Sequence, residues 1–162
     1  MSIEIRNILY ASDLGDSSKY AFEFAALEAS KHNAKVTFLN VVEPPSHSAE
    51  TIFGNLSDKN AFQTMRQEGL QRIKALIEQR IDKLSHSTAV SLQQKPEARI
   101  EEGHAAETII EVADEIGADL IIVGSRSRTH STLERFFVGS TAQNVVQLSA
   151  IPVLIIPIPV EN

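Results

Sequence analysis

Strand-like and helix-like hydrophobic patterns alternate along this sequence from its beginning to its end. Short runs of branched and aromatic apolar residues predict strands at residues 5–11, 35–42, 120–123 and 153–156, with a further short strand within 97–102. Apolar residues spaced three or four apart predict helices at residues 17–31, 58–84, 106–116 and 139–148. Because a strand, a helix and a second strand form a right-handed crossover, this order favours an α/β fold with one parallel sheet.

The segment around residue 120 carries the clearest strand signal. Leu120, Ile121, Ile122 and Val123 form an unbroken apolar run, which is typical of strands buried on both faces of a parallel sheet. Gly117 precedes this run, where the left-handed C-terminal cap of the preceding helix is expected. The sequence therefore predicts a helix that ends at Gly117 and is followed by a buried strand of the parallel sheet.

In the first predicted helix, large apolar residues recur at helical spacing. Tyr20, Phe24 and Leu27 predict one buried stripe, with Ala21 and Ala25 beside it.

Composition favours one globular domain and excludes several functional classes. No linker or repeat divides the 162 residues, so we expect a single domain over residues 1–162, and 43% hydrophobic residues suffice for its core. Residues 46–57 show no period and predict a loop. The absence of cysteine excludes disulfides, thiolate metal sites and thiol catalysis. A net charge of −6 argues against nucleic acid as a partner, because phosphate backbones require a basic surface.

The sequence carries no membrane or export signal. Its first residues, MSIEIRNILYASD, lack the cationic and apolar regions of a signal peptide. No apolar run approaches the ~20 residues that span a bilayer, and the run from Ile151 to Val160 is interrupted by prolines. We therefore expect a cytoplasmic protein.

Small and polar residues follow the predicted strands. In an open α/β sheet, ligands bind beyond the carboxyl ends of the strands, where the strand order reverses. The residues delivered to this edge are Ala11, Ser12, Asp13, Val41, Val42, Glu101, Glu102, Gly103, Gly124 and Ser125. This edge is the default ligand site.

An anion site is predicted where the last helix begins. Gly139, Ser140 and Thr141 stand at its N-terminus, where free N–H groups and the helix dipole favour a phosphate. The alternative is an ordinary helix start with Ser140 as the N-cap. Arg126 and Arg128 could neutralise phosphate charge, or they could be solvated surface residues.

The sequence lacks the signatures of common enzymes. It contains no G-x-x-x-x-G-K-[ST] loop, no G-x-G-x-x-G after the first strand and no G-x-S-x-G elbow. His104 and His130 are isolated from other metal-ligand residues. Asp13 could accept hydrogen bonds from a ribose or an adenine amino group, or it could cap the following helix. We therefore predict no catalytic residue and no metal ligand.

Four stretches, in order, resemble the universal stress protein family. They read ILYASD, FLNVVEP, GHAAETIIEVADEIGADLIIVGSR and VGSTAQNVVQLSAIPVLII, and together they cover nearly the whole chain. The resemblance implies a Rossmann-like open sheet of five parallel strands in the order 3-2-1-4-5, with helices on both faces. It also implies a homodimer formed through the last strand, from Val153 to Ile156.

The nucleotide motif of that family is altered here. ATP-binding members carry G-x-x-G, nine residues and then G-[ST]. Gly124 matches the first glycine and Gly139 with Ser140 matches the final pair, but Ser127 replaces the second glycine. Residues 128–138 make the intervening stretch eleven residues long, two more than the pattern. Serine tolerates positive φ poorly, whereas extra loop residues cost little.

By resemblance, the chain is an adenine-nucleotide-binding module that responds to stress and signals to a protein partner of unknown identity. The ligand would be ATP or a related nucleotide, with or without Mg²⁺, and hydrolysis would at most be slow. The implied nucleotide-binding residues are Ala11, Ser12, Asp13, Val41, Gly124, Ser125, Arg126, Ser127, Gly139, Ser140 and Thr141. The alternatives are the same fold acting as a protein-interaction module without nucleotide, and a nucleotide hydrolase or transferase.

Overall fold

The computed structural model describes residues 2–15, 18–44, 59–86, 90–125 and 139–157. Its strands are β1 (Asn7–Ala11), β2 (Lys35–Val42), β3 (Glu97–Glu102), β4 (Leu120–Ser125) and β5 (Val153–Pro157). Its helices are α1 (Ser18–His32), α3 (Lys59–Ser85), α4 (Ala105–Ile116) and α5 (Ser140–Leu148). The predicted elements are confirmed, with ends that differ by about two residues at most. The loop expected at residues 46–57 lies outside the described residues.

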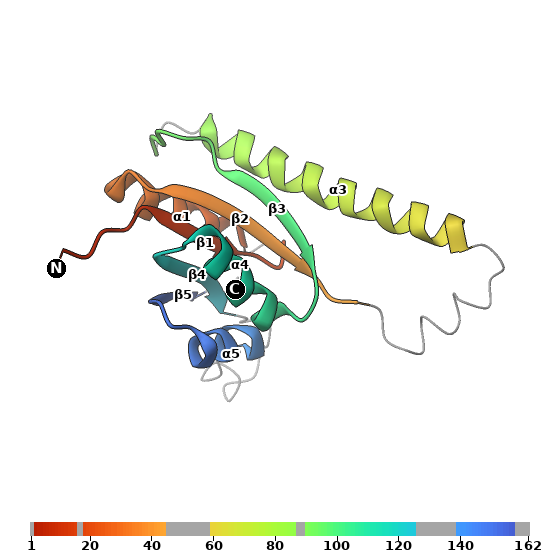
Figure 1. The fold of residues 1–162 in the computed structure, drawn as a ribbon. Helices are drawn as coiled ribbons and strands as arrows, with labels where there is room; N and C mark the ends of the chain where they lie inside the picture. The colour runs from red at the N-terminus through yellow and green to blue at the C-terminus, as the bar shows by residue number, and fades with distance from the viewer. Residues whose placement is uncertain (1, 16–17, 45–58, 87–89, 126–138, 158–162) are drawn as a thin grey trace, which may run out of the picture.

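The five strands pair in parallel in the order β3-β2-β1-β4-β5, which confirms the expected topology (Figure 1). β1 is central, because Tyr10 stands beside Phe38 of β2 on one side and beside Ile122 of β4 on the other. After β1 the chain adds β2 and then β3 on one side of that strand. It later adds β4 and then β5 on the other side. The strand order therefore reverses at β1, where sheets of this kind bind ligands.

Helices cover both faces of the sheet, as expected. Successive side chains of a strand point to opposite faces, so Ile8 and Tyr10 pack in one core with α1 and α3, whereas Leu9 packs in the other with α4 and α5. The first core contains the rings of Tyr10, Phe22 and Phe38, whose centroids lie 4.8 to 5.6 Å apart. These rings pack directly beneath the end of β1.

α1 buries a different side from the one that its large residues predict. Tyr20 is 48% exposed and Leu27 is 40% exposed, so the prediction that both lie in a buried stripe is wrong. The buried apolar residues of α1 are Ala21, Phe22, Ala25, Ala26 and Ala29. Alanine side chains let the helix backbone approach the close-packed sheet, and this packing outweighs the burial of larger residues at the helix flank.

α3 packs on the sheet through its C-terminal part. Its buried residues are Ile77, Ile81 and Leu84. The N-terminal half runs alongside and past β3 (Figure 1), and Arg66 there forms an ion pair with Glu102. Neither α3 nor another helix in the described part of the chain is long and apolar enough to cross a membrane.

Gly103 forms the tight turn between β3 and α4. Its φ angle is 155°, and its N–H donates to the carbonyl oxygen of Val42 at 3.1 Å. A Cβ atom at this position would lie 2.4 Å from Oγ1 of Thr108, whose side chain is buried. Glycine satisfies both constraints because it has no Cβ and tolerates positive φ.

We expect Gly103→Ala to lower the free energy of unfolding by about 1–3 kcal/mol, because the added methyl group overlaps a buried hydroxyl. Gly69→Ala in α3 is the matched control, since a Cβ there has no neighbour within 4 Å. The control should raise the free energy of unfolding by about 0.5–1 kcal/mol through helix propensity. Urea denaturation measures both changes, and equal stability of the two variants would contradict this account of the turn.

Candidate functional site

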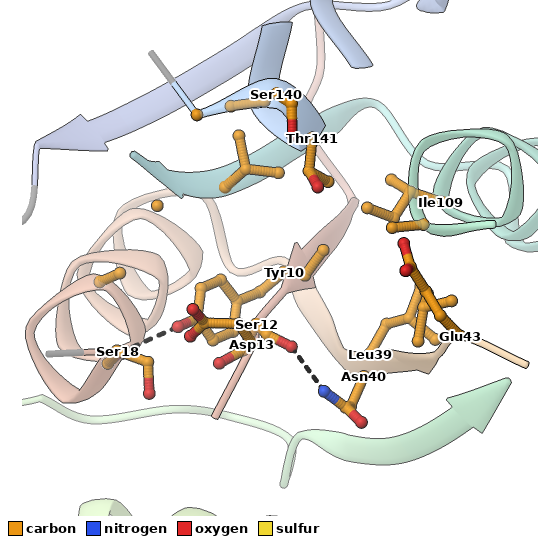
Figure 2. A pocket seen from close by; sticks show the side chains of 18 residues that line it. Tyr10, Ser12, Asp13, Ser18, Leu39, Asn40, Glu43, Ile109, Ser140 and Thr141 are labelled. Carbon is orange, nitrogen blue, oxygen red and sulfur yellow. Dashed lines mark hydrogen bonds between the residues drawn. The ribbon is translucent and has the colours of Figure 1, made fainter. Parts of the chain in front are cut away.

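A cavity of about 470 Å³ opens where the strand order reverses (Figure 2). Residues from the ends of β1, β2 and β4 line it, together with residues of α1, α4 and the start of α5. The predicted site residues in its lining are Ala11, Ser12, Asp13, Val41, Gly124, Gly139, Ser140 and Thr141. The sheet topology thus brings together residues that are far apart in the sequence.

The remaining predicted residues lie elsewhere. Ser125 ends β4 but does not line the cavity. Val42 and residues 101–103 also stand at the carboxyl ends of β2 and β3, as expected, but they do not line the cavity. β3 is the outermost strand, and β2 separates it from the central β1. The predicted residues Arg126, Ser127, Arg128 and His130 lie outside the described residues.

Short side-chain hydrogen bonds shape the loop after β1. Oγ of Ser12 accepts from the N–H of Leu14 at 3.0 Å, and Oδ1 of Asp13 accepts from the N–H of Gly15 at 2.9 Å. Leu14 has a φ angle of 61°, as tight turns often require. The bond from the N–H of Gly15 to Asp13 closes an Asx turn ahead of α1.

Two side chains beneath this loop hold its backbone. Nδ2 of Asn40 donates to the carbonyl oxygen of Ser12 at 2.8 Å, and the hydroxyl of Tyr10 donates to the carbonyl oxygen of Ser18 at 3.0 Å (Figure 2). Asn40 and Tyr10 are both buried. The two bonds therefore satisfy buried polar groups while they fix both ends of the loop.

Arg80 of α3 holds the same loop from outside the cavity. Its guanidinium group donates to the carbonyl oxygen of Leu14 at 2.9 Å and to Oγ of Ser18 at 2.5 Å. Sequence reasoning missed this residue, because one arginine among many charged helix residues has no distinguishing pattern. Asn40 had a usable signal: a polar residue inside the apolar run KVTFLNVV indicates a buried hydrogen bond.

The start of α5 lines the cavity through Gly139, Ser140, Thr141 and Ala142. Gly139 is the N-cap and Ser140 the first helical residue, so the alternative that Ser140 is the N-cap is wrong. No side chain caps this end among the described residues. The first bond runs from the N–H of Gln143 to the carbonyl oxygen of Gly139 at 3.0 Å. The preceding N–H groups of the helix therefore lack a helical acceptor.

Several lining residues were not predicted from the sequence. They are Tyr10, Ser18, Ala21, Leu39, Asn40, Glu43, Ala105, Ile109, Val123 and Ala142. Most are apolar, and whether such a residue faces a core or a cavity depends on packing that periodicity does not report. The cavity thus has an apolar wall from β2, β4 and α4, and the carboxylates that the described residues bring to it are those of Asp13 and Glu43.

Burial raises the pKa of Tyr10 to about 12, chiefly through desolvation of the phenolate, from an ordinary value of 10.0. Asp13 nearby raises this pKa further, whereas hydrogen bonding to Ser12 and the charge of Arg80 lower it. The unfolded chain therefore loses this proton at lower pH than the folded protein does. The stability that the neutral hydroxyl contributes is fully present below pH 10 and is lost as the pH rises towards 12.

Raising the pH from 8 to 11 is expected to lower the free energy of unfolding of the native protein and of Tyr10→Phe by different amounts. The decrease should be about 1.4 kcal/mol larger in the native protein, because only its Tyr10 can ionise. At pH 8 the variant should be less stable by about 1 kcal/mol, because the carbonyl of Ser18 loses its donor. Denaturant titrations at both pH values measure these differences. A parallel loss in both proteins would show that Tyr10 ionises as readily when folded as when unfolded.

The family model described as the universal stress protein family matches residues 4–157 of this chain. The chain belongs to the universal stress protein family.

Its relatives are distant in sequence but similar in length. A universal stress protein of Thermus aquaticus is 28% identical over 93% of this chain and 98% of that protein. One from Methanocaldococcus jannaschii is 24% identical over 96% of this chain and 97% of that protein. The family match therefore extends along nearly the whole chain.

Solved structures of universal stress proteins share the fold. UspA from Lactobacillus plantarum superimposes with a TM-score of 0.62 at 24% identity and covers 96% of this chain and 99% of its own. A universal stress protein in complex with cAMP also has a TM-score of 0.62 at 24% identity, with 94% and 97% covered. At this identity the likeness establishes the fold.

Proposed function

We propose that this chain binds an adenine nucleotide in the cavity at the end of β1 and works as a homodimeric stress-response module in the cytoplasm. The observation that carries the proposal is the combination, in one cavity, of an apolar wall with a helix N-terminus that no side chain of the described residues caps. Its volume of about 470 Å³ lies in the usual range for small-molecule sites. A purine base suits the wall, and phosphate groups suit the helix end.

The phosphate end is the start of α5. Backbone N–H groups and the positive end of the helix dipole favour an anion there, and Ser140 and Thr141 add hydroxyl donors. Figure 2 shows Ser140 and Thr141 on the side of the cavity opposite Ser12 and Asp13. The carboxylate of Asp13 repels phosphate groups, so the nucleotide is expected to lie with its phosphates towards α5.

Relatives favour adenine nucleotides as the class of ligand. One fold neighbour was solved in complex with cAMP, and a universal stress protein from Archaeoglobus fulgidus, with a TM-score of 0.52, was solved in complex with dAMP. ATP is the first ligand to test here. The proposal includes no catalytic step, and it assigns Mg²⁺ no residue of this chain.

We expect ATP to saturate the native protein in isothermal titration, and Gly139→Val to weaken binding at least about tenfold by blocking the approach of phosphate to the N–H groups of α5. Gly139 has a φ angle of −52° and a ψ angle of 151°, which valine also adopts, so the variant should fold. Gln147→Val, at the exposed far end of α5, is the control and should bind normally.

Two results would count against this assignment. Unchanged affinity in Gly139→Val would mean that the phosphates bind elsewhere. No saturation of the native protein at millimolar ATP would remove nucleotide binding and favour a protein-interaction module on the same fold.

The dimer is proposed to form through β5. This strand is at the edge of the sheet and pairs with β4 on one side, and its residues from Val153 to Ile155 are partly buried. An apolar edge strand offers unpaired N–H and C=O groups to a second chain, and a two-fold axis would cover both edges at once.

The register of β5 supplies a selective test. The N–H of Ile121 donates to the carbonyl oxygen of Pro152, so residue 152 faces β4 and Ile155 faces the open edge. We expect Ile155→Pro to remove an outward N–H, shift the protein from dimer to monomer, and leave the bonds to β4 in place. Ile155→Val keeps the N–H and should remain dimeric in sedimentation velocity. A dimeric Ile155→Pro protein would place the interface elsewhere.

A further inference from the structure

Glu43 brings a carboxylate to the apolar side of the cavity. It directly follows β2, lines the cavity and lies two residues beyond Val41 on the same side of the chain. Figure 2 shows its carboxylate pointing towards Ile109 of α4, above Leu39. The position places a charged acceptor at the rim of the wall that the proposed base would contact.

This carboxylate has no hydrogen-bond or ion-pair partner in the part of the chain that the structure describes. Other glutamates have cationic partners there: Lys35 pairs with Glu97, and Arg99 pairs with Glu115. Asp13, the other carboxylate of the cavity, already accepts the N–H of Gly15. Among the described residues, Glu43 is therefore the cavity carboxylate whose acceptor sites are all open to a ligand.

The apolar wall and the carboxylate of Glu43 together restrict which part of a ligand can bind beside Glu43. The wall formed by Leu39, Val41 and Ile109 suits the flat face of a purine. An ionised carboxylate only accepts hydrogen bonds, so it favours a ring edge that carries an N–H₂ donor and disfavours one that carries a carbonyl oxygen. Phosphate groups are repelled from the same position by charge.

We infer that Glu43 determines the base specificity of the site by accepting a hydrogen bond from the exocyclic amino group at position 6 of adenine. The inference rests on the proposed nucleotide-binding function and adds to it the residue that reads the base. Hypoxanthine, which has a carbonyl oxygen at position 6, would place an acceptor against an acceptor and bind more weakly.

The test compares ATP with inosine triphosphate, because the two ligands share the triphosphate and differ at position 6. Dissociation constants are measured by isothermal titration for the native protein, Glu43→Gln and Glu111→Gln. Glu111 is exposed on α4 outside the cavity lining, so its variant reproduces the change in net charge without changing the rim. The ratio of the two constants cancels any general effect of charge on phosphate binding.

The native protein and Glu111→Gln are expected to bind ATP about five- to tenfold more tightly than inosine triphosphate. In Glu43→Gln the preference should fall to within about twofold, because the amide group can accept from adenine or donate to hypoxanthine. An unchanged preference in Glu43→Gln, or no preference in the native protein, would overturn the inference and leave the proposed function standing. Failure of both nucleotides to bind the native protein would overturn both.

Discussion

β1 pairs with a strand on each of its edges, and the site depends on this arrangement. β2 and β4 flank β1 in parallel, and the chain continues outward from them in opposite directions. The helices that follow cover different faces, so neither closes over the carboxyl end of β1. The cavity is what remains at that end. Its polar groups come from the loop after β1 and from the start of α5, and its apolar wall comes from the flanking strands and α4.

The loop after β1 keeps its shape through donors that are distant in the sequence. Asn40 and Arg80 reach it from β2 and α3, across sequence separations of 28 and 66 residues, and Tyr10 supports it from the core below. Among the described residues, no buried side-chain nitrogen or oxygen lacks a partner. The polar groups beneath the cavity are therefore held in place before any ligand arrives, which lowers the ordering cost of binding.

Charge divides the cavity into two ends with different chemistry. The strand ends contribute the carboxylates of Asp13 and Glu43, whereas α5 contributes backbone N–H groups and the positive end of its dipole. An anionic ligand thus has one favourable orientation. The rings of Tyr10, Phe22 and Phe38 pack together in the core, and burial raises the pKa of the Tyr10 hydroxyl that fixes the loop.

Local patterns were sufficient to predict the sheet, the order of its elements, and the part of the cavity lining that comes from the strand ends and the start of α5. Hydrophobic period reports whether a segment is strand or helix, and parallel topology then brings the residues after each strand to one edge. Local patterns were not sufficient for α1, where Tyr20 and Leu27 suggested the wrong buried side of the helix. The alanine side of α1 is buried instead, because alanine packs against the sheet more closely than larger residues do. Local patterns also did not show that the end of β3 lies outside the cavity lining, because nothing in its own residues reports its distance from the reversal point.

By itself, the sequence determined the type and order of the elements, the family, and the start of α5 at Gly139 to Thr141, all of which follow from neighbours in the chain. Only the tertiary structure decided that Asn40 and Arg80 hold the loop after β1, and that Glu43 faces the apolar wall without a partner in the described chain. These contacts join segments separated by many residues, and which face of each strand or helix meets the cavity is set by packing across the sheet.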